Sequence, residues 1–183
     1  SSNKEVYVRI PNLEIRKCFK NDIQKRFDDV IKKDNLALNI ANALLEGNVD
    51  FVQDKLGPLL RSFVSIRDTA TRAPHENYYH GFLNGIFTNC KDNLGEYHSN
   101  FESGDGYPDI LFKDIDCRKV AIIEIKSASI GSDIETLSEK AISQIIDKNY
   151  AEPLMSNKTV KHIHGYGIAF AGKSCFISVK KIK

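Results

Sequence analysis

The sequence GDGYPDILFKDIDCRKVAIIEIK at residues 104–126 decides the fold. Its two short apolar segments flank a polar stretch at 114–118, a pattern typical of a β-hairpin. If the turn is centred in that stretch, Asp109 lies opposite Glu124, and directly opposed residues have Cβ atoms roughly 5 Å apart. Because side chains alternate along a strand, Lys126 lies on the same face as Glu124. The sequence therefore predicts two carboxylates and one amine at one edge of a sheet.

This combination of groups is suited to a hard divalent cation. Mg²⁺ prefers near-octahedral oxygen ligation and usually takes only one or two protein carboxylates, which Asp109 and Glu124 would supply with the backbone carbonyl of Ile125. A bound metal activates a water and neutralises charge on a phosphate, and Lys126 would orient that water or stabilise the transition state as a cation. The same three side chains also fit a surface ion cluster, which is common and contributes little stability. The residues alone leave both interpretations open.

The segments around the hairpin predict a mixed α/β fold with a central sheet of about five strands. The expected elements are a helix at 76–88, a strand at 96–102, the hairpin strands, a helix from 132, and strands at 162–170 and 174–180. Ser132 and Glu135 match the S-x-x-E pattern of a capping box at the start of the second helix. The resulting order is a helix, three strands, a helix and two strands, which contains the sequence αβββαβ.

Residues 1–70 predict a helical linker or annex region that precedes an α/β domain at 71–183. The expected elements are a strand at 5–10, helices at 12–33 and 36–46, and a helix at 51–61. Gly47 ends the helix at 36–46, Asn48 or Asp50 caps the next one, and Gly57-Pro58 interrupts it.

The amino-acid composition indicates where in the cell the protein is located more clearly than it indicates what the protein does. The net charge of +2 over 183 residues argues neither for nor against nucleic-acid binding. The four cysteines are scattered without a CxxC pair, which argues against a zinc site or a disulfide framework and favours free thiols in a reducing cytoplasm. No apolar run approaches the ~20 residues of a membrane span, and no signal peptide is present, so we expect a cytoplasmic protein without a membrane partner. The sequence carries no indication of the oligomeric state.

Three further patterns favour structural roles. Residues 167–174 match the P-loop pattern, but the segment that follows is β-branched, so a β-hairpin turning at 171–173 is favoured. His162 and His164 lack a third ligand nearby in sequence, and we expect surface positions for both, near Lys158 and Lys161. His80 could approach a phosphate, but its aromatic neighbours in the sequence favour a structural role.

The motifs G-Y-P-D at 106–109 and E-I-K at 124–126, placed in an αβββαβ order, resemble the PD-(D/E)XK nuclease superfamily. More narrowly, the chain resembles the C-terminal nuclease-type domain of bacterial AAA-ATPase-like proteins. That match rests on YVRIPNLEIR at 7–16, ALLEGNVDF at 43–51, YHGFL at 79–83, ESGDGYPDI at 102–110, the Gln144…Tyr150-Ala151-Glu152 helix end and YGIAF at 166–170. The resemblance covers nearly the whole chain.

The resemblance implies a restriction-endonuclease-like core and Mg²⁺- or Mn²⁺-dependent hydrolysis of phosphodiester bonds that leaves a 5′-phosphate. DNA is the expected nucleic-acid substrate, and an AAA-ATPase module is a possible partner in a longer protein. The resemblance to the nuclease superfamily also implies two further site residues. Glu76 matches an acidic residue on the first core helix that assists metal binding, and Gln144 matches a site glutamine of RecB-like nucleases. The alternatives are that Glu76 merely suits a helix N-terminus and that Gln144 is an exposed helix residue.

Three functional hypotheses follow. The favoured one is a metal-dependent nuclease that acts through Asp109, Glu124 and Lys126. The second is a catalytically silent nuclease-like domain that serves binding or regulation in an AAA-ATPase protein. The third is a structural or oligomerisation module with residues 1–70 as its interaction surface.

Overall fold

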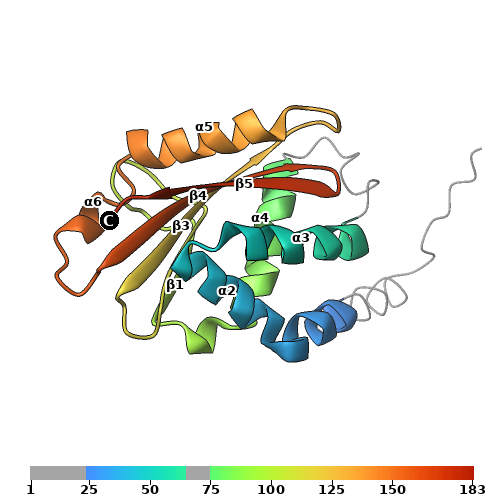
Figure 1. The fold of residues 1–183 in the computed structure, drawn as a ribbon, viewed down its shortest axis with the longest axis horizontal. Coiled ribbons are helices and arrows are strands. Elements are labelled where there is room, and N and C mark those ends of the chain that lie inside the picture. Colours follow the sequence, from blue (N-terminus) through green and yellow to red (C-terminus); the bar gives the residue numbers. More distant parts are fainter. Residues whose placement is uncertain (1–23, 65–74) are drawn as a thin grey trace, which may run out of the picture.

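A five-stranded mixed sheet forms the centre of the structure, with helices on both faces (Figure 1). The computed structural model describes residues 24–64 and 75–183. The strands are β1 (Glu96–Ser99), β2 (Ile110–Lys113), β3 (Lys119–Ser127), β4 (His162–Ala171) and β5 (Ser174–Lys181), and they lie side by side in that order. Neighbouring strands run antiparallel except for β3 and β4, which are parallel.

The helices confirm the predicted αβββαβ order. They are a helical segment over 24–32, α2 (Leu36–Glu46), α3 (Val49–Phe63), α4 (His75–Thr88), α5 (Ile134–Asp147) and the short α6 (Glu152–Met155). Parallel strands need a crossover connection, and α5 with α6 supplies it between β3 and β4. The fold is therefore a mixed α/β fold consistent with a restriction-endonuclease-like core.

The β2–β3 hairpin has the predicted register. Ile110 pairs with Ile123, so one further step along each strand places Asp109 opposite Glu124. The Asp114 carboxylate closes the turn, because its Oδ1 accepts the backbone N–H groups of the residues four and five positions later at 2.6 and 2.8 Å. A short polar turn with its own internal acceptor fixes the pairing of both strands.

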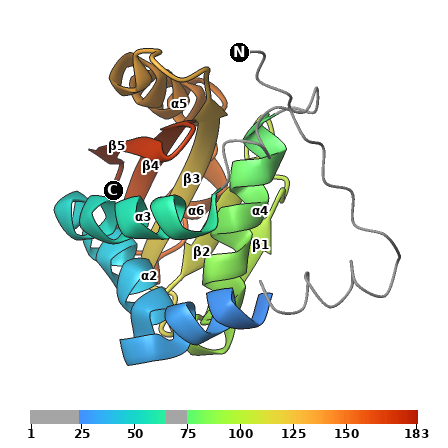
Figure 2. The same cartoon turned by 90° about the vertical axis from the view of Figure 1, so that its right-hand side faces the viewer.

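The helices divide between the two faces of the sheet. α2, α3 and α4 cover one face, and α5 covers the other (Figures 1 and 2). Ile123 and Ile125 of β3 enter the larger core beneath α2, α3 and α4, whereas Val120 and Ile122 enter the smaller core on the other face. By the same alternation, Glu124 faces α5.

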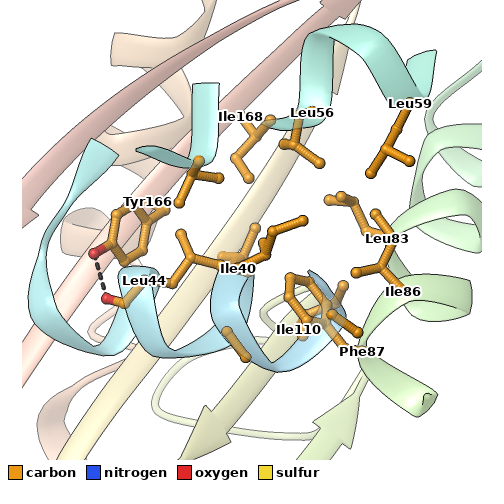
Figure 3. Packing of buried hydrophobic residues seen from close by; sticks show 14 of the residues in the cluster. Ile40, Leu44, Leu56, Leu59, Leu83, Ile86, Phe87, Ile110, Tyr166 and Ile168 are labelled. Atoms are coloured by element: carbon orange, nitrogen blue, oxygen red, sulfur yellow. Dashed lines mark hydrogen bonds between the residues drawn. The ribbon is translucent and has the colours of Figure 1, made fainter. Parts of the chain in front are cut away.

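The larger core joins the helices before residue 64 to the sheet. Figure 3 shows the apolar side chains that meet there, among them Ile40, Leu44, Leu56, Leu59, Leu83, Ile86 and Ile168. The hydroxyl of Tyr166 in β4 donates a hydrogen bond to the carbonyl of Leu44 in α2 (Figure 3). Residues 24–64 thus share a core with the sheet, and the predicted domain boundary at residues 70 and 71 remains a prediction.

α5 lies unusually close to β4 at Gly167. A Cβ atom at this position would lie 1.9 Å from the carbonyl oxygen of Ser138 and 2.9 Å from the Cβ of Ala141. Next to it, the hydroxyl groups of Ser138 and Ser178 form a 2.6 Å hydrogen bond between α5 and β5. Glycine at this position therefore sets how closely α5 approaches the sheet.

We expect Gly167→Ala to destabilise the protein by about 2 kcal/mol, because the added methyl group forces α5 away from β4 and overpacked cores typically lose this much. Urea denaturation measures the change. Gly81→Ala is the matched control, since no atom lies within 4 Å of a Cβ built at Gly81 and alanine is the better helix former. Equal losses in both variants would contradict this account of the packing.

Several expectations about element ends are wrong. Pro58 does not interrupt α3; it lies on the exposed side of the helix, where solvent can satisfy the carbonyl that its missing N–H leaves free. α5 is capped by Asp133 rather than Ser132, because the Asp133 carboxylate accepts the backbone N–H of Thr136 at 3.1 Å. The first strand ends at Ser99 instead of residue 102, since Asn100 adopts a left-handed backbone conformation with φ of +52°.

Other local expectations are confirmed. Gly47 ends α2 with φ of +81°, and the Asn48 side chain caps α3 by accepting the backbone N–H of Phe51. The P-loop-like stretch forms the β4–β5 hairpin, which turns at Gly172 with φ of +59°. The predicted strand at 5–10 and the start of the helix at 12–33 lie outside the described residues.

The expectation of two surface histidines is only half right. His162 is exposed, but His164 is half-buried, and its ring packs against Gly47. Burial lowers the pKa of His164. None of the helices in the described ranges is long and apolar enough to cross a membrane.

Candidate active site

Asp109, Glu124 and Lys126, the three residues of the predicted motif, lie where β2 begins and β3 ends. Asp109 immediately precedes β2, and its Oδ2 accepts the backbone N–H of Ile125 at 2.7 Å. Glu124 is 3% exposed, and its Oε1 accepts a hydrogen bond from Nζ of Lys126 at 3.0 Å. The hairpin register therefore provides the contact that holds Asp109, and the alternation of side chains along β3 provides the one that holds Glu124.

α5 brings Gln144 to the same place. Its Nε2 donates hydrogen bonds to Oε1 of Glu124 and, at 3.2 Å, to the hydroxyl of Tyr150. Tyr150 is buried and follows the end of α5. The predicted site glutamine is thus in contact with the predicted glutamate. Sequence reasoning assigned no role to Tyr150, because its contact with Gln144 exists only after the chain turns back beyond α5.

The loop before Asp109 is fastened to the end of α5. The Ser103 hydroxyl donates to the carbonyl of Tyr150 at 2.7 Å, and the Asp105 N–H donates to the carbonyl of Lys148 at 2.8 Å. Gly104 has φ of +62°, and a Cβ there would lie 2.2 Å from the carbonyl oxygen of Asn149. Glycine is required by both the conformation and the close approach. These contacts fix the position from which the chain enters Asp109.

A polar network from α4 and β1 supports the backbone of Asp109 from the other side. Nε2 of His80 lies 3.0 Å from the carbonyl oxygen of Asp109 and 3.0 Å from Oγ of Ser99. Asn84 reaches both the His80 ring and Ser99 through Nδ2, and it accepts a hydrogen bond from the Tyr97 hydroxyl. His80 therefore contacts a site residue through that residue's backbone.

The carboxyl groups of Asp109 and Glu124 both have pKa values above their ordinary ones. Burial, with repulsion from Asp109, raises the pKa of Glu124 to about 7, although Lys126 opposes the shift. Burial likewise raises the pKa of Asp109 against the opposing hydrogen bond from Ile125. Burial alone would lower the pKa of Lys126, but its hydrogen bond to Glu124 and the surrounding negative charge outweigh this and raise it. A bound cation would relieve the repulsion between the carboxylates.

The site fits a divalent cation held by two carboxylates. Oε2 of Glu124 is buried and has no hydrogen-bond partner among the described residues, and buried polar atoms are rarely left unpaired without a reason. Asp109 accepts the Ile125 N–H through Oδ2, a bond that does not engage its Oδ1. An oxygen without a partner beside a second carboxylate is the donor set that Mg²⁺ and Mn²⁺ accept.

Glu76 belongs to the electrostatic surroundings of this pair. It lies in the first turn of α4, and its charge acts on Asp109, Glu124 and Lys126. In residues 24–64 and 75–183, no group of three or more histidine, cysteine, aspartate or glutamate side chains is close enough to hold a metal ion together. Glu76 is thus not grouped with Asp109 and Glu124 in this arrangement, and a ligand role for Glu76 or for the Ile125 carbonyl stays a prediction.

Comparison with models of protein families identifies a match. Residues 74–180 match a family model described as the PD-(D/E)XK nuclease superfamily. A search among curated proteins found no match. The matched region includes α4, all five strands and α5, and with them Asp109, Glu124, Lys126 and Gln144. The chain therefore belongs to the PD-(D/E)XK nuclease superfamily.

Proposed function

We propose that this protein is a Mg²⁺- or Mn²⁺-dependent nuclease that hydrolyses phosphodiester bonds of DNA through Asp109, Glu124 and Lys126. The observation that carries the proposal is the buried Glu124 carboxylate, which has one oxygen without a partner and lies opposite Asp109 with Lys126 hydrogen-bonded to it. Such a pair of acids is costly to bury in the absence of a counter-charge. A bound divalent metal ion would supply the positive charge that Lys126 alone does not.

The proposed roles of the residues follow from their contacts. Asp109 and Glu124 would hold the metal from opposing strands with the Ile125 carbonyl as a further ligand, and Glu76 would add negative charge from the first turn of α4. When bound, the metal would lower the pKa of a water and neutralise charge on the phosphate. Gln144 would hold Oε1 of Glu124 and so leave Oε2 for the metal.

Lys126 would act as a cation. Its raised pKa keeps the amine protonated near neutral pH, so it can donate hydrogen bonds to the attacking water and to the phosphoryl oxygen on which negative charge develops. Donors aimed at a developing charge stabilise the transition state more than the ground state. The hydrogen bond between Lys126 and Glu124 keeps the amine beside the proposed metal ligands.

The second candidate is a catalytically silent nuclease-like domain that binds or regulates. The contacts among Asp109, Glu124, Lys126 and Gln144 favour the enzyme, since a domain without catalytic function has no need to keep all four together. An AAA-ATPase module in a longer chain and a cytoplasmic location belong to the proposal as well. The location is supported by the unpaired Cys90, Cys117 and Cys175.

The direct test is cleavage of labelled single- and double-stranded DNA and RNA with Mg²⁺, with Mn²⁺ and with chelator. We expect cleavage only with metal, and a rate about a hundredfold lower in Lys126→Met, the typical cost of one lost transition-state donor. Lys119→Met is the control, because Lys119 lies on the same strand but pairs with Glu46 instead. Metal-independent binding without cleavage would support the silent domain, and the absence of both would contradict a nucleic-acid function.

A further inference from the structure

Two exposed aromatic side chains belong to the chain segments next to Asp109. Tyr107 is 58% exposed and lies two residues before Asp109, and Phe101 is 48% exposed. The backbone N–H of Asn100 donates to the carbonyl of Asp109 at 3.0 Å, so Phe101 follows a residue that is hydrogen-bonded to the site. The chain can span at most ~7 Å over two residues. Both rings are therefore carried by backbone that directly adjoins the backbone of Asp109.

The loop that carries these rings is held in place. Besides its contacts with the end of α5, it contains a bridge between Ser103 and Gly106. The Gly106 backbone packs against the ring of Tyr150. The Phe101 ring is stacked on His98, with ring centroids 4.3 Å apart and planes 26° apart. Large apolar side chains on a fixed loop lose little conformational entropy when a flat ligand covers them.

The charge around the rings favours bases over phosphates as their partners. The same loop carries the exposed acidic residues Glu102 and Asp105, which would repel a phosphate backbone. The cation at the site, Lys126, belongs to β3 and is hydrogen-bonded to Glu124 rather than to this loop. A nucleic-acid strand would thus place its phosphate at Lys126 and present its bases, not its phosphates, to the loop.

From these observations we infer that Tyr107 and the His98–Phe101 stack form a base-stacking site for an unpaired nucleotide next to the scissile phosphate. The substrate is then single-stranded DNA or a duplex with a frayed or unpaired segment, because a base within a duplex is covered by its neighbours. Stacking of bases on aromatic side chains is a major source of single-strand affinity and does not depend on sequence. The inference rests on the proposed nuclease function.

The test is fluorescence anisotropy with a labelled single strand and a labelled blunt duplex, in chelator so that neither is expected to be cleaved. Tyr107→Ala should weaken binding of the single strand about tenfold, and Phe101→Ala should weaken it to a similar extent. Tyr107→Phe should retain wild-type affinity, whereas Tyr107→Leu, which keeps an apolar side chain but no ring, should lose it. Ile115→Ala is the control, since Ile115 is 67% exposed but lies in the turn at the opposite end of the hairpin.

The inference is overturned if the wild-type protein binds the single strand no more tightly than the duplex, or if Tyr107→Ala binds the single strand like the wild type. Metal-dependent cleavage of the duplex alongside either result would leave the nuclease function intact and remove only the preference for unpaired bases. The absence of metal-dependent cleavage of every substrate would remove the nuclease function itself. Mn²⁺ binding measured by calorimetry should be unchanged in Tyr107→Ala, which shows that the metal site is still folded.

Discussion

Asp109→Asn is expected to abolish Mn²⁺ binding and to lower the rate of metal-dependent cleavage by about a thousandfold or more. The carboxylate supplies one of only two charged ligands on the hairpin, and the activated water and the neutralised phosphate both depend on the metal. An asparagine oxygen can still accept the Ile125 N–H that Oδ2 of Asp109 now accepts. The hairpin should therefore keep its register while the charge that attracts the cation is lost.

Two measurements check this expectation: calorimetric titration with Mn²⁺ and single-turnover cleavage of labelled DNA. Asp116→Asn is the matched control, because Asp116 is an exposed residue in the turn of the same hairpin. Asp116→Asn makes the same change from carboxylate to amide, but in the turn, at the end of β2 and β3 that is away from the site. Mn²⁺ binding of wild-type strength in Asp109→Asn would refute the proposed metal site, whatever the cleavage assay shows.

Glu124→Gln should stabilise the metal-free protein at high pH while removing metal binding. The pKa of Glu124 is about 7 in the folded protein, against an ordinary value of 4.5. Between these two values the folded state binds more protons than the unfolded state, so the stability of the wild type falls as the pH rises through this range. Glutamine carries no charge at any pH and avoids this loss.

The size of the effect follows from the shift in pKa. The free energy of unfolding of Glu124→Gln, relative to that of the wild type, should rise by about 3 kcal/mol between about pH 4 and about pH 8 in chelator. Urea denaturation of both proteins across this range measures the difference, and the titration of groups that do not interact with Glu124 cancels in the comparison. Glu139→Gln, an exposed change on α5, should show no such trend. A difference between Glu124→Gln and wild type that does not depend on pH would contradict the buried, repelled state of Glu124.

Added Mn²⁺ should reverse the order of stability. A ligand that binds only the folded state stabilises it by an amount that grows with the logarithm of its concentration relative to Kd, and the wild type binds the metal through the ionised carboxylate that is costly without it. The wild type should therefore gain stability with Mn²⁺ above pH 7, and Glu124→Gln should not. This behaviour would show that the free-energy cost of ionising the buried Glu124 beside Asp109 is offset when the metal binds.

Local sequence signals account for much of the fold. The polar turn at 114–118 gives the hairpin a register, and that register places Asp109 opposite Glu124. Gly47 and Asn48 give one helix end and the next helix start. The β-branched residues after Gly172 identify a strand where the P-loop pattern would require a helix. Each of these features depends on neighbours within a few residues along the chain.

The predictions that were wrong share a physical origin, because contacts between distant parts of the chain outweighed a local sequence preference. Pro58 interrupts a helix by its local preference, but the packing of buried Leu56 and Leu59 on either side of it keeps α3 continuous. Ser132 and Asp133 are both competent helix caps, and only the path of the chain into α5 selects the second. His164 is polar in sequence but half-buried in the fold, because the end of α2 packs over it.

The sequence by itself therefore determined the order of the elements, the hairpin register and the pairing of Asp109 with Glu124 near Lys126, since periodicity and turn length act over short distances. Only the tertiary structure decided that Gln144 and Tyr150 reach Glu124, that the loop before Asp109 is fastened to the end of α5, and that Glu124 is buried enough to raise its pKa. These features depend on the approach of α5 to the sheet over Gly167. Contacts between distant segments, and the burial they cause, arise only when the whole chain is packed.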